Sequence, residues 1–161
     1  MNAKLFSFLF LGILFICWSG CGPDTVDPYF AFIPAGDYEV GSKGHYLNPQ
    51  RRVHLESFEI GKKEVTNAEF AAFVDATGYK TLAEKRKTGK VFFPGLAEFK
   101  WKEDTTANWR FPNGVSRGGI EAKMDHPVTG ISFYDIEAYC KWAQVRLPTL
   151  DEWEVACRAG E

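Results

Sequence analysis

The sequence predicts an α+β domain, because strand-like and helical patterns occupy separate parts of the chain. Residues 29–60 alternate apolar and polar side chains between turn residues, which is typical of strands. Segments that start near Thr66, Ser132 and Thr149 carry the apolar spacing and capping signals of helices. Residues 80–117 show neither the alternation of a strand nor the apolar spacing of a helix. With 161 residues, 45% of them hydrophobic and 25% charged, the chain has the size and composition of one globular domain with appendages.

The strand-like segment is divided by turns. One alternating run ends at Pro34-Ala35-Gly36 and a second ends at Gly41-Ser42. A third run is broken at Glu56-Ser57, which is typical of either a bent strand or a hairpin. The apolar residues of these runs are Phe30, Phe32, Tyr38, Val40, Val53, Leu55, Phe58 and Ile60.

Each predicted helix begins with a capping box, in which Ser or Thr is followed three residues later by Glu or Asp. Gly78 is the predicted end of the first helix. The capping pairs are Thr66–Glu69, Ser132–Asp135 and Thr149–Glu152. Apolar spacing predicts three inner faces, which are Phe70, Phe73 and Val74; Ile136, Tyr139, Cys140 and Ala143; and Trp153, Ala156 and Cys157.

The middle segment, residues 80–117, holds nine basic and four acidic side chains among its aromatic residues. Aromatic side chains next to lysines can stack on the bases of a nucleic acid. The composition also fits a long ordered loop whose aromatics enter the core, and we favour this second interpretation. The formal net charge of −2 excludes a generally basic nucleic-acid binder, so we expect no nucleic-acid partner. The aromatics are Phe92, Phe93, Phe99, Trp101, Trp109 and Phe111.

Residues 1–20 have the pattern of a secretory signal peptide. Lys4 precedes an apolar run, Leu5 to Trp18, that is too short for a typical transmembrane helix. Trp18-Ser19-Gly20-Cys21 resembles the lipobox of bacterial lipoproteins. This resemblance implies a lipidated Cys21 at the mature N-terminus, residues 21–28 as a tether, and an exported protein anchored in the bacterial envelope or periplasm. Plain secretion with an incidental cysteine remains the alternative.

Export to an oxidising compartment makes Cys140 and Cys157 disulfide candidates. The predicted helices that carry them are joined by only a few residues, so the length of chain between them does not exclude a direct bridge. The three histidines are scattered without the spacing of metal ligands, and we interpret them as surface or turn residues. They are His45, His54 and His126.

Several motifs, in order and spacing over residues 29–161, together resemble the formylglycine-generating enzyme (sulfatase-modifying factor) family. They are Phe32-Ile33-Pro34-Ala35-Gly36-Asp37-Tyr38, Val53-His54-Leu55, Glu64-Val65-Thr66-Asn67-Ala68-Glu69-Phe70, Ala76-Thr77-Gly78-Tyr79, Asp125-His126-Pro127-Val128, Arg146-Leu147-Pro148-Thr149 and Glu152-Trp153-Glu154. Ala107-Asn108-Trp109-Arg110 is similar to a segment of the oxidases themselves, which many distant relatives lack.

The resemblance implies an irregular, loop-rich, C-type-lectin-like fold of roughly twice this length, which would be incomplete here. It implies oxidation of a sulfatase cysteine to Cα-formylglycine with O2 and copper, and hence an unfolded or nascent sulfatase as partner. The family's copper-binding cysteines lie in its C-terminal half, beyond residue 161. We therefore expect no catalytic residue in this chain and no activity of the chain alone.

The resemblance also implies roles for three residues. Glu64 aligns near a structural calcium site, although a solvated glutamate before a helix is the simpler interpretation. Cys140 and Cys157 align with cysteines that pair with downstream partners in some relatives, so we expect no bond between them. A non-catalytic envelope lipoprotein remains the alternative function, and carbohydrate binding ranks last.

Overall fold

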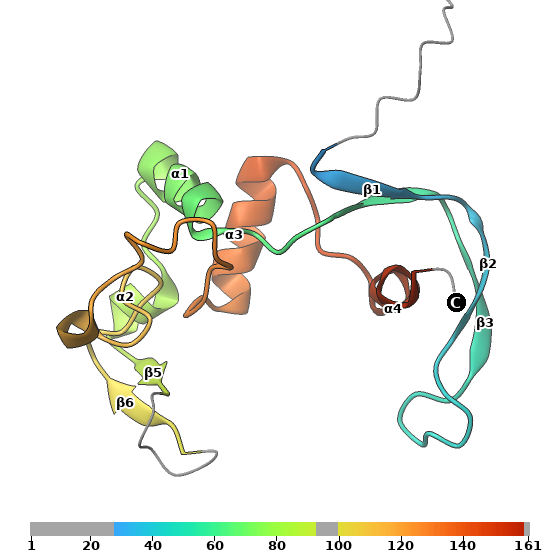
Figure 1. Ribbon diagram of the computed structural model, residues 1–161, viewed down its shortest axis with the longest axis horizontal. Coiled ribbons are helices and arrows are strands. Elements are labelled where there is room, and N and C mark those ends of the chain that lie inside the picture. The colour runs from blue at the N-terminus through green and yellow to red at the C-terminus, as the bar shows by residue number, and fades with distance from the viewer. Residues whose placement is uncertain (1–27, 93–99, 160–161) are drawn as a thin grey trace, which may run out of the picture.

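The computed structural model describes residues 28–92 and 100–159, so the leader, Cys21 and most of the tether lie outside the described residues. The elements form two groups (Figure 1). One group combines a bent two-stranded ribbon with helix α4, and the other gathers the remaining helices and a short hairpin. Two connecting segments join the groups, one between β4 and α1 and the other between α3 and α4.

The ribbon consists of β1 (Phe30–Ile33) and β2 (Gly36–Val40) against β3 (Arg51–Leu55) and β4 (Phe58–Gly61). β1 pairs with β4 and β2 pairs with β3, both antiparallel. Ile33 lies opposite Phe58 and Gly36 lies opposite Leu55, so both halves share one register. The breaks at residues 34–35 and 56–57 therefore face each other. Of the two predicted alternatives at Glu56-Ser57, the bent strand is confirmed, and the hairpin turn lies at residues 41–50.

The bend preserves one half-buried face of the ribbon. The inward-facing residues change from odd to even numbers across each break, because both residues of the break are exposed and the flanking inward positions are three residues apart instead of two. These residues are Ala31, Ile33, Gly36, Tyr38, Val40, Val53, Leu55, Phe58 and Ile60. A two-stranded ribbon buries too little to be stable alone, so the ribbon depends on the helix packed against it.

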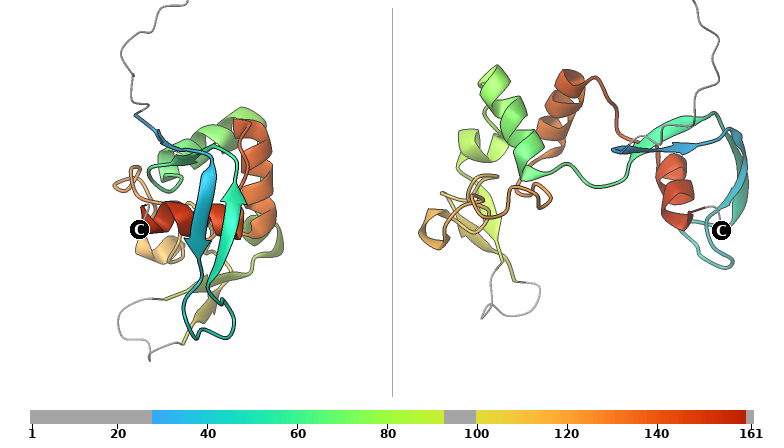
Figure 2. Two further views of the ribbon diagram at one scale, coloured as in Figure 1. Left: turned by 90° about the vertical axis from the view of Figure 1, so that its right-hand side faces the viewer. Right: turned by 45° about the horizontal axis from the view of Figure 1, so that its top comes forward.

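Helix α4 (Leu150–Arg158) lies against the ribbon at β2 (Figure 2). Polar contacts join the two elements. The Glu154 carboxylate accepts hydrogen bonds from the Gly41 N–H at 2.6 Å and from Asn48 Nδ2 at 3.1 Å. The Arg158 guanidinium donates to the Gly41 carbonyl at 2.5 Å. Hydrogen bonds from Asn48 and then from Gly41, together with the Arg158 guanidinium, lower the pKa of Glu154 to about 2.

The second group contains α1 (Asn67–Thr77), α2 (Leu82–Arg86), β5 (Gly89–Val91), β6 (Lys102–Asp104), the 3₁₀ helix η1 (Val115–Arg117) and α3 (Phe133–Ala143). Its core is aromatic. Phe70 lies 5.4 Å from Phe73, 5.1 Å from Trp109 and 6.0 Å from Tyr139, measured between ring centroids. Phe70, Phe73 and Trp109 are each at most 2% exposed. These rings hold α1, α3 and the loop at residue 109 together.

All three predicted capping boxes are present, and Gly78 ends α1 with φ of 64°. The predicted inner face of α4 is wrong, because Trp153 is 55% exposed and Cys157 is exposed. The buried residues of α4 are Glu152 and Val155. This helix contacts the ribbon with its charged side chains, which apolar spacing does not predict.

The middle segment is only partly the loop that the sequence predicts. Trp109 is fully buried as expected, whereas Phe92 and Trp101 are 46% and 63% exposed and pair with each other at 5.8 Å. Phe93 and Phe99 lie outside the described residues. The short elements α2, β5 and β6 were not predicted. Among the helices that the structure describes, none has the length and apolar character needed to cross a membrane.

Candidate functional site

The segment that most resembles the oxidases, Ala107 to Arg110, is a tight turn built around Asn108. The Asn108 side-chain oxygen accepts hydrogen bonds from the N–H groups of Arg110 at 2.8 Å and Phe111 at 3.2 Å. The backbones of Asn108 and Phe111 also exchange two hydrogen bonds. An asparagine suits such a turn, because its short side chain caps the following N–H groups.

Trp109 and Arg110 anchor this turn to α1. The Trp109 indole is fully buried against Phe70, and the Arg110 guanidinium lies 4.2 Å from the centre of the indole. Arg110 also contacts Asp75 on α1 at 3.3 Å. The buried Trp109 ring therefore has a packing role, whereas the Arg110 side chain remains 43% exposed.

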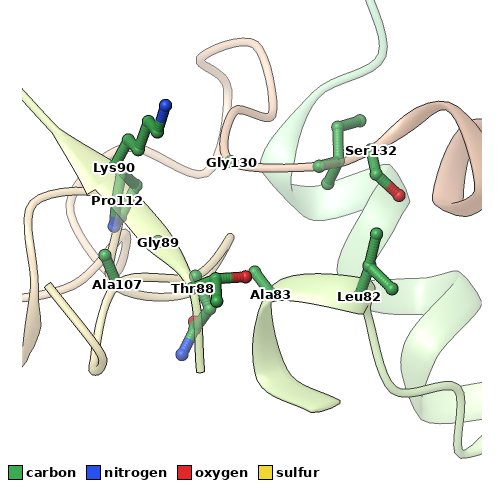
Figure 3. Close-up of a pocket in the computed structure, with 11 residues that line it drawn as sticks. Leu82, Ala83, Thr88, Gly89, Lys90, Ala107, Pro112, Gly130 and Ser132 are labelled. Atoms are coloured by element: carbon green, nitrogen blue, oxygen red, sulfur yellow. The ribbon is translucent and has the colours of Figure 1, made fainter. Parts of the chain in front are cut away.

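A half-open cavity of about 280 Å³ lies beside this turn (Figure 3). Its walls come from the start of α2, from β5, from the turn and from residues 130–132. Glycines allow these segments to approach closely, since a Cβ atom at Gly89 would collide with Ala107 and one at Gly130 would lie 3.3 Å from the Asn108 backbone. The lining residues are Leu82, Ala83, Thr88, Gly89, Lys90, Ala107, Asn108, Pro112, Gly130, Ile131 and Ser132.

The polar groups of the cavity wall are mostly engaged in structural hydrogen bonds. The Ser132 hydroxyl donates to Asp135 at 2.7 Å, and the Asn108 oxygen caps its own turn. Lys90 is the one charged residue among the described residues that line the cavity. Among the described residues, the cavity wall carries no carboxylate, histidine or cysteine side chain.

Asp135 bonds two residues of the cavity wall, Leu82 and Ser132, and joins three segments. Its carboxylate is fully buried and accepts hydrogen bonds from the Tyr79 hydroxyl at 2.9 Å and the Leu82 N–H at 3.0 Å. It also accepts from the N–H and the hydroxyl of Ser132, both at 2.7 Å. Burial, followed by the hydrogen bond and charge of Asp135, raises the pKa of Tyr79 to about 12. Four donors satisfy the carboxylate, so Asp135 is a structural group.

The cysteines of the described residues do not form a copper site. Cys140 on α3 is half-buried, Cys157 on α4 is exposed, and both are free thiols. Burial, with a smaller effect from the Glu137 charge, raises the pKa of Cys140 and so disfavours the thiolate that Cu(I) requires. Residues 28–92 and 100–159 contain no group of three or more His, Cys, Asp and Glu side chains placed to hold a metal. The described residues therefore do not fit copper, whose ligands are expected beyond residue 161.

The other sequence-predicted site residues remain separate. Glu64 is exposed in the connection before α1, and its calcium role stays a prediction. The described cysteines are not bonded to each other, and their pairing with downstream partners also stays a prediction. His54 contacts Asp37 across the ribbon at 2.8 Å, and the His45 ring accepts from a turn N–H at 3.1 Å, as surface and turn residues do.

Comparison with known proteins identifies the family. Residues 22–161 match the sulfatase-modifying factor enzyme 1-like domain. The formylglycine-generating enzymes of Bos taurus and Streptomyces coelicolor are 39% and 37% identical over 146 residues, covering 80% of this chain but 39% and 46% of the relatives. An inactive C-alpha-formylglycine-generating enzyme 2 of Mus musculus is 34% identical over 150 residues, covering 83% of this chain and 48% of the relative. The chain thus spans less than half the length of these relatives, and it belongs to the sulfatase-modifying factor enzyme family.

Proposed function

We propose that the chain is part of an exported enzyme that oxidises a sulfatase cysteine to Cα-formylglycine with O2 and copper. The observation that carries this proposal is the similarity of 37–39% identity, over 80% of the chain, to formylglycine-generating enzymes of two distant organisms. A C-type-lectin-like fold, completed by sequence outside these 161 residues, is part of the proposal. The mixed helices and small sheets of the chain support it at the level of fold class.

In this proposal the chain supplies a scaffold. Copper bound by two thiolates would supply oxygen activation, and burial, which raises the pKa of Cys140, disfavours a thiolate at that residue. The contribution of residues 28–159 is to fix the turn at Asn108 and the start of α3 through buried aromatic and carboxylate contacts. A rigid frame of this kind positions catalytic groups that other segments carry.

The test compares the chain alone with the chain continued into the remaining part of the Streptomyces coelicolor relative. Each is incubated with copper, O2, a thiol reductant and a cysteine peptide of sulfatase sequence, and the peptide mass is measured. The proposal predicts replacement of the thiol by an aldehyde only with the joined protein. A matching peptide with serine in place of cysteine is the control. Conversion by the chain alone would overturn its role as a scaffold, and no conversion by the folded joined protein would overturn the proposed oxidation.

A non-catalytic envelope lipoprotein is the second candidate. It is favoured by the similarity to an inactive member of the family, which is 34% identical to this chain. A joined protein that folds but leaves the cysteine peptide unchanged, while an active relative converts it, would favour this second function.

Anchoring by lipid at Cys21 and location in the bacterial envelope belong to both candidates. We expect the chain, expressed with its leader in bacteria, to incorporate labelled fatty acid and to partition into detergent. Cys21→Ala should abolish both properties, whereas Cys17→Ala, which alters the neighbouring cysteine of the leader, should preserve them. A soluble, unlabelled wild-type product would contradict lipid attachment.

A further inference from the structure

Helix α4 exposes its largest apolar residues and packs with polar side chains and with Val155. Leu150, Trp153 and Cys157 recur at i, i+3 and i+7, which places them in one stripe along the helix. Leu150 is 70% exposed, Trp153 is 55% exposed and Cys157 is exposed. We call these three residues the α4 outer stripe.

The packed face of α4 is made by other residues. Glu154 and Arg158 bind Gly41 of the hairpin, Asp151 pairs with Arg51, and Val155 is buried. In Figure 1 the ribbon lies on one side of α4, and no described element covers the side that faces away from it. The ribbon therefore already occupies the polar face, and it leaves the α4 outer stripe without a partner among the described residues.

Exposed apolar residues continue into the connection before α4. Val145 and Leu147 are 42% and 44% exposed. Large exposed apolar residues that gather in one short stretch of chain are typical of a surface that another polypeptide covers. A membrane surface is a poor alternative, because α4 carries Asp151, Glu152 and Glu154 against one arginine, whereas helices that lie on membranes are rich in lysine and arginine.

We propose that the α4 outer stripe is the docking face for the part of the sulfatase-modifying factor domain that this chain does not span. The chain covers 39% and 46% of its Bos taurus and Streptomyces coelicolor relatives, so more than half of a relative's sequence is available to cover the stripe. Docking there buries the Trp153 ring and shields the Cys157 thiol at the end of the stripe. The proposal rests on family membership and goes beyond the proposed oxidation.

The test uses the full chain in a mild detergent and the remaining part of the Streptomyces coelicolor relative as a separate polypeptide. Both are kept under reducing conditions, so that only burial and no disulfide can protect a thiol. Alkylation of Cys157 is followed by peptide mass spectrometry. Addition of the second polypeptide should slow this alkylation at least ten-fold.

Trp153→Glu should abolish the protection of Cys157, and so should Leu150→Glu. Trp101→Glu is the matched control, because Trp101 is 63% exposed but lies in the other group of elements, and this variant should keep the protection. Unchanged circular dichroism identifies folded variants, as expected for exposed positions.

Three results would overturn the proposal. They are absence of protection, protection that survives Trp153→Glu and Leu150→Glu, and protection that rises with the concentration of the chain alone, which would assign the stripe to a second copy. No activity is measured, so failure of the proposed oxidation would leave a positive result standing.

Discussion

Replacing Asp135 by alanine removes one buried carboxylate that links α3 to the start of α2. The substitution leaves the Leu82 N–H and the Tyr79 hydroxyl without their acceptor. Each buried donor left unpaired costs about 1–3 kcal/mol, and loss of the capping contact to Ser132 costs about 1 kcal/mol more. We therefore expect Asp135→Ala to lower the free energy of unfolding by about 3–7 kcal/mol.

Glu69→Ala is the matched control for this variant. Glu69 occupies the same third position of a capping box, on α1, but its contacts with Thr66 are exposed to solvent. Its loss should cost about 0.5–1 kcal/mol. Urea unfolding of the chain without its leader, followed by circular dichroism, measures both variants. If Asp135→Ala cost no more than Glu69→Ala, the assigned role of the buried carboxylate would be refuted.

Three further predictions concern α4, the hairpin and the thiols. The pKa of Glu154 is lowered to about 2 from its ordinary value of 4.5. The carboxylate therefore stabilises the fold fully above pH 4.5, and this stabilisation is lost as the pH falls toward 2. The urea midpoint, measured between pH 2 and 6, should depend less on pH in Glu154→Gln than in the wild type. Gly41→Ala should destabilise the hairpin by more than Gly44→Ala. Both glycines have a positive φ, but only at Gly41 would the new methyl group collide with backbone atoms. The midpoints of thermal unfolding of the two variants test this difference. Cys157 should react with a thiol reagent faster than Cys140, whose pKa is raised by burial, and equal rates measured by peptide mass spectrometry would contradict the described exposures.

Local sequence signals predicted the starts of α1, α3 and α4, because a capping box involves only four neighbouring residues. The same signal is present at Thr81 and Glu84, where it begins α2, but a five-residue helix has no apolar period to draw attention to it. The short strands β5 and β6 depend on pairing between residues 89–91 and 102–104, which no local pattern encodes.

The predicted inner face of α4 is wrong for a different reason. Apolar spacing correctly places Trp153 and Cys157 on one side of the helix, yet it does not reveal which side faces the ribbon. That choice is made by the Glu154 carboxylate and by Gly41, which are 113 positions apart in sequence. The cavity beside Asn108 likewise depends on close approach of glycines from distant segments, so sequence reasoning missed it.

We infer that this part of the domain is a scaffold and that its thiols are not copper ligands. A direct test titrates residues 28–161, which contain only Cys140 and Cys157, into a coloured Cu(I)–chelator complex under anaerobic conditions. We expect the absorbance of the complex to stay unchanged at one equivalent of protein. Removal of one Cu(I) per chain, abolished by Cys140→Ser and by Cys157→Ser, would contradict it.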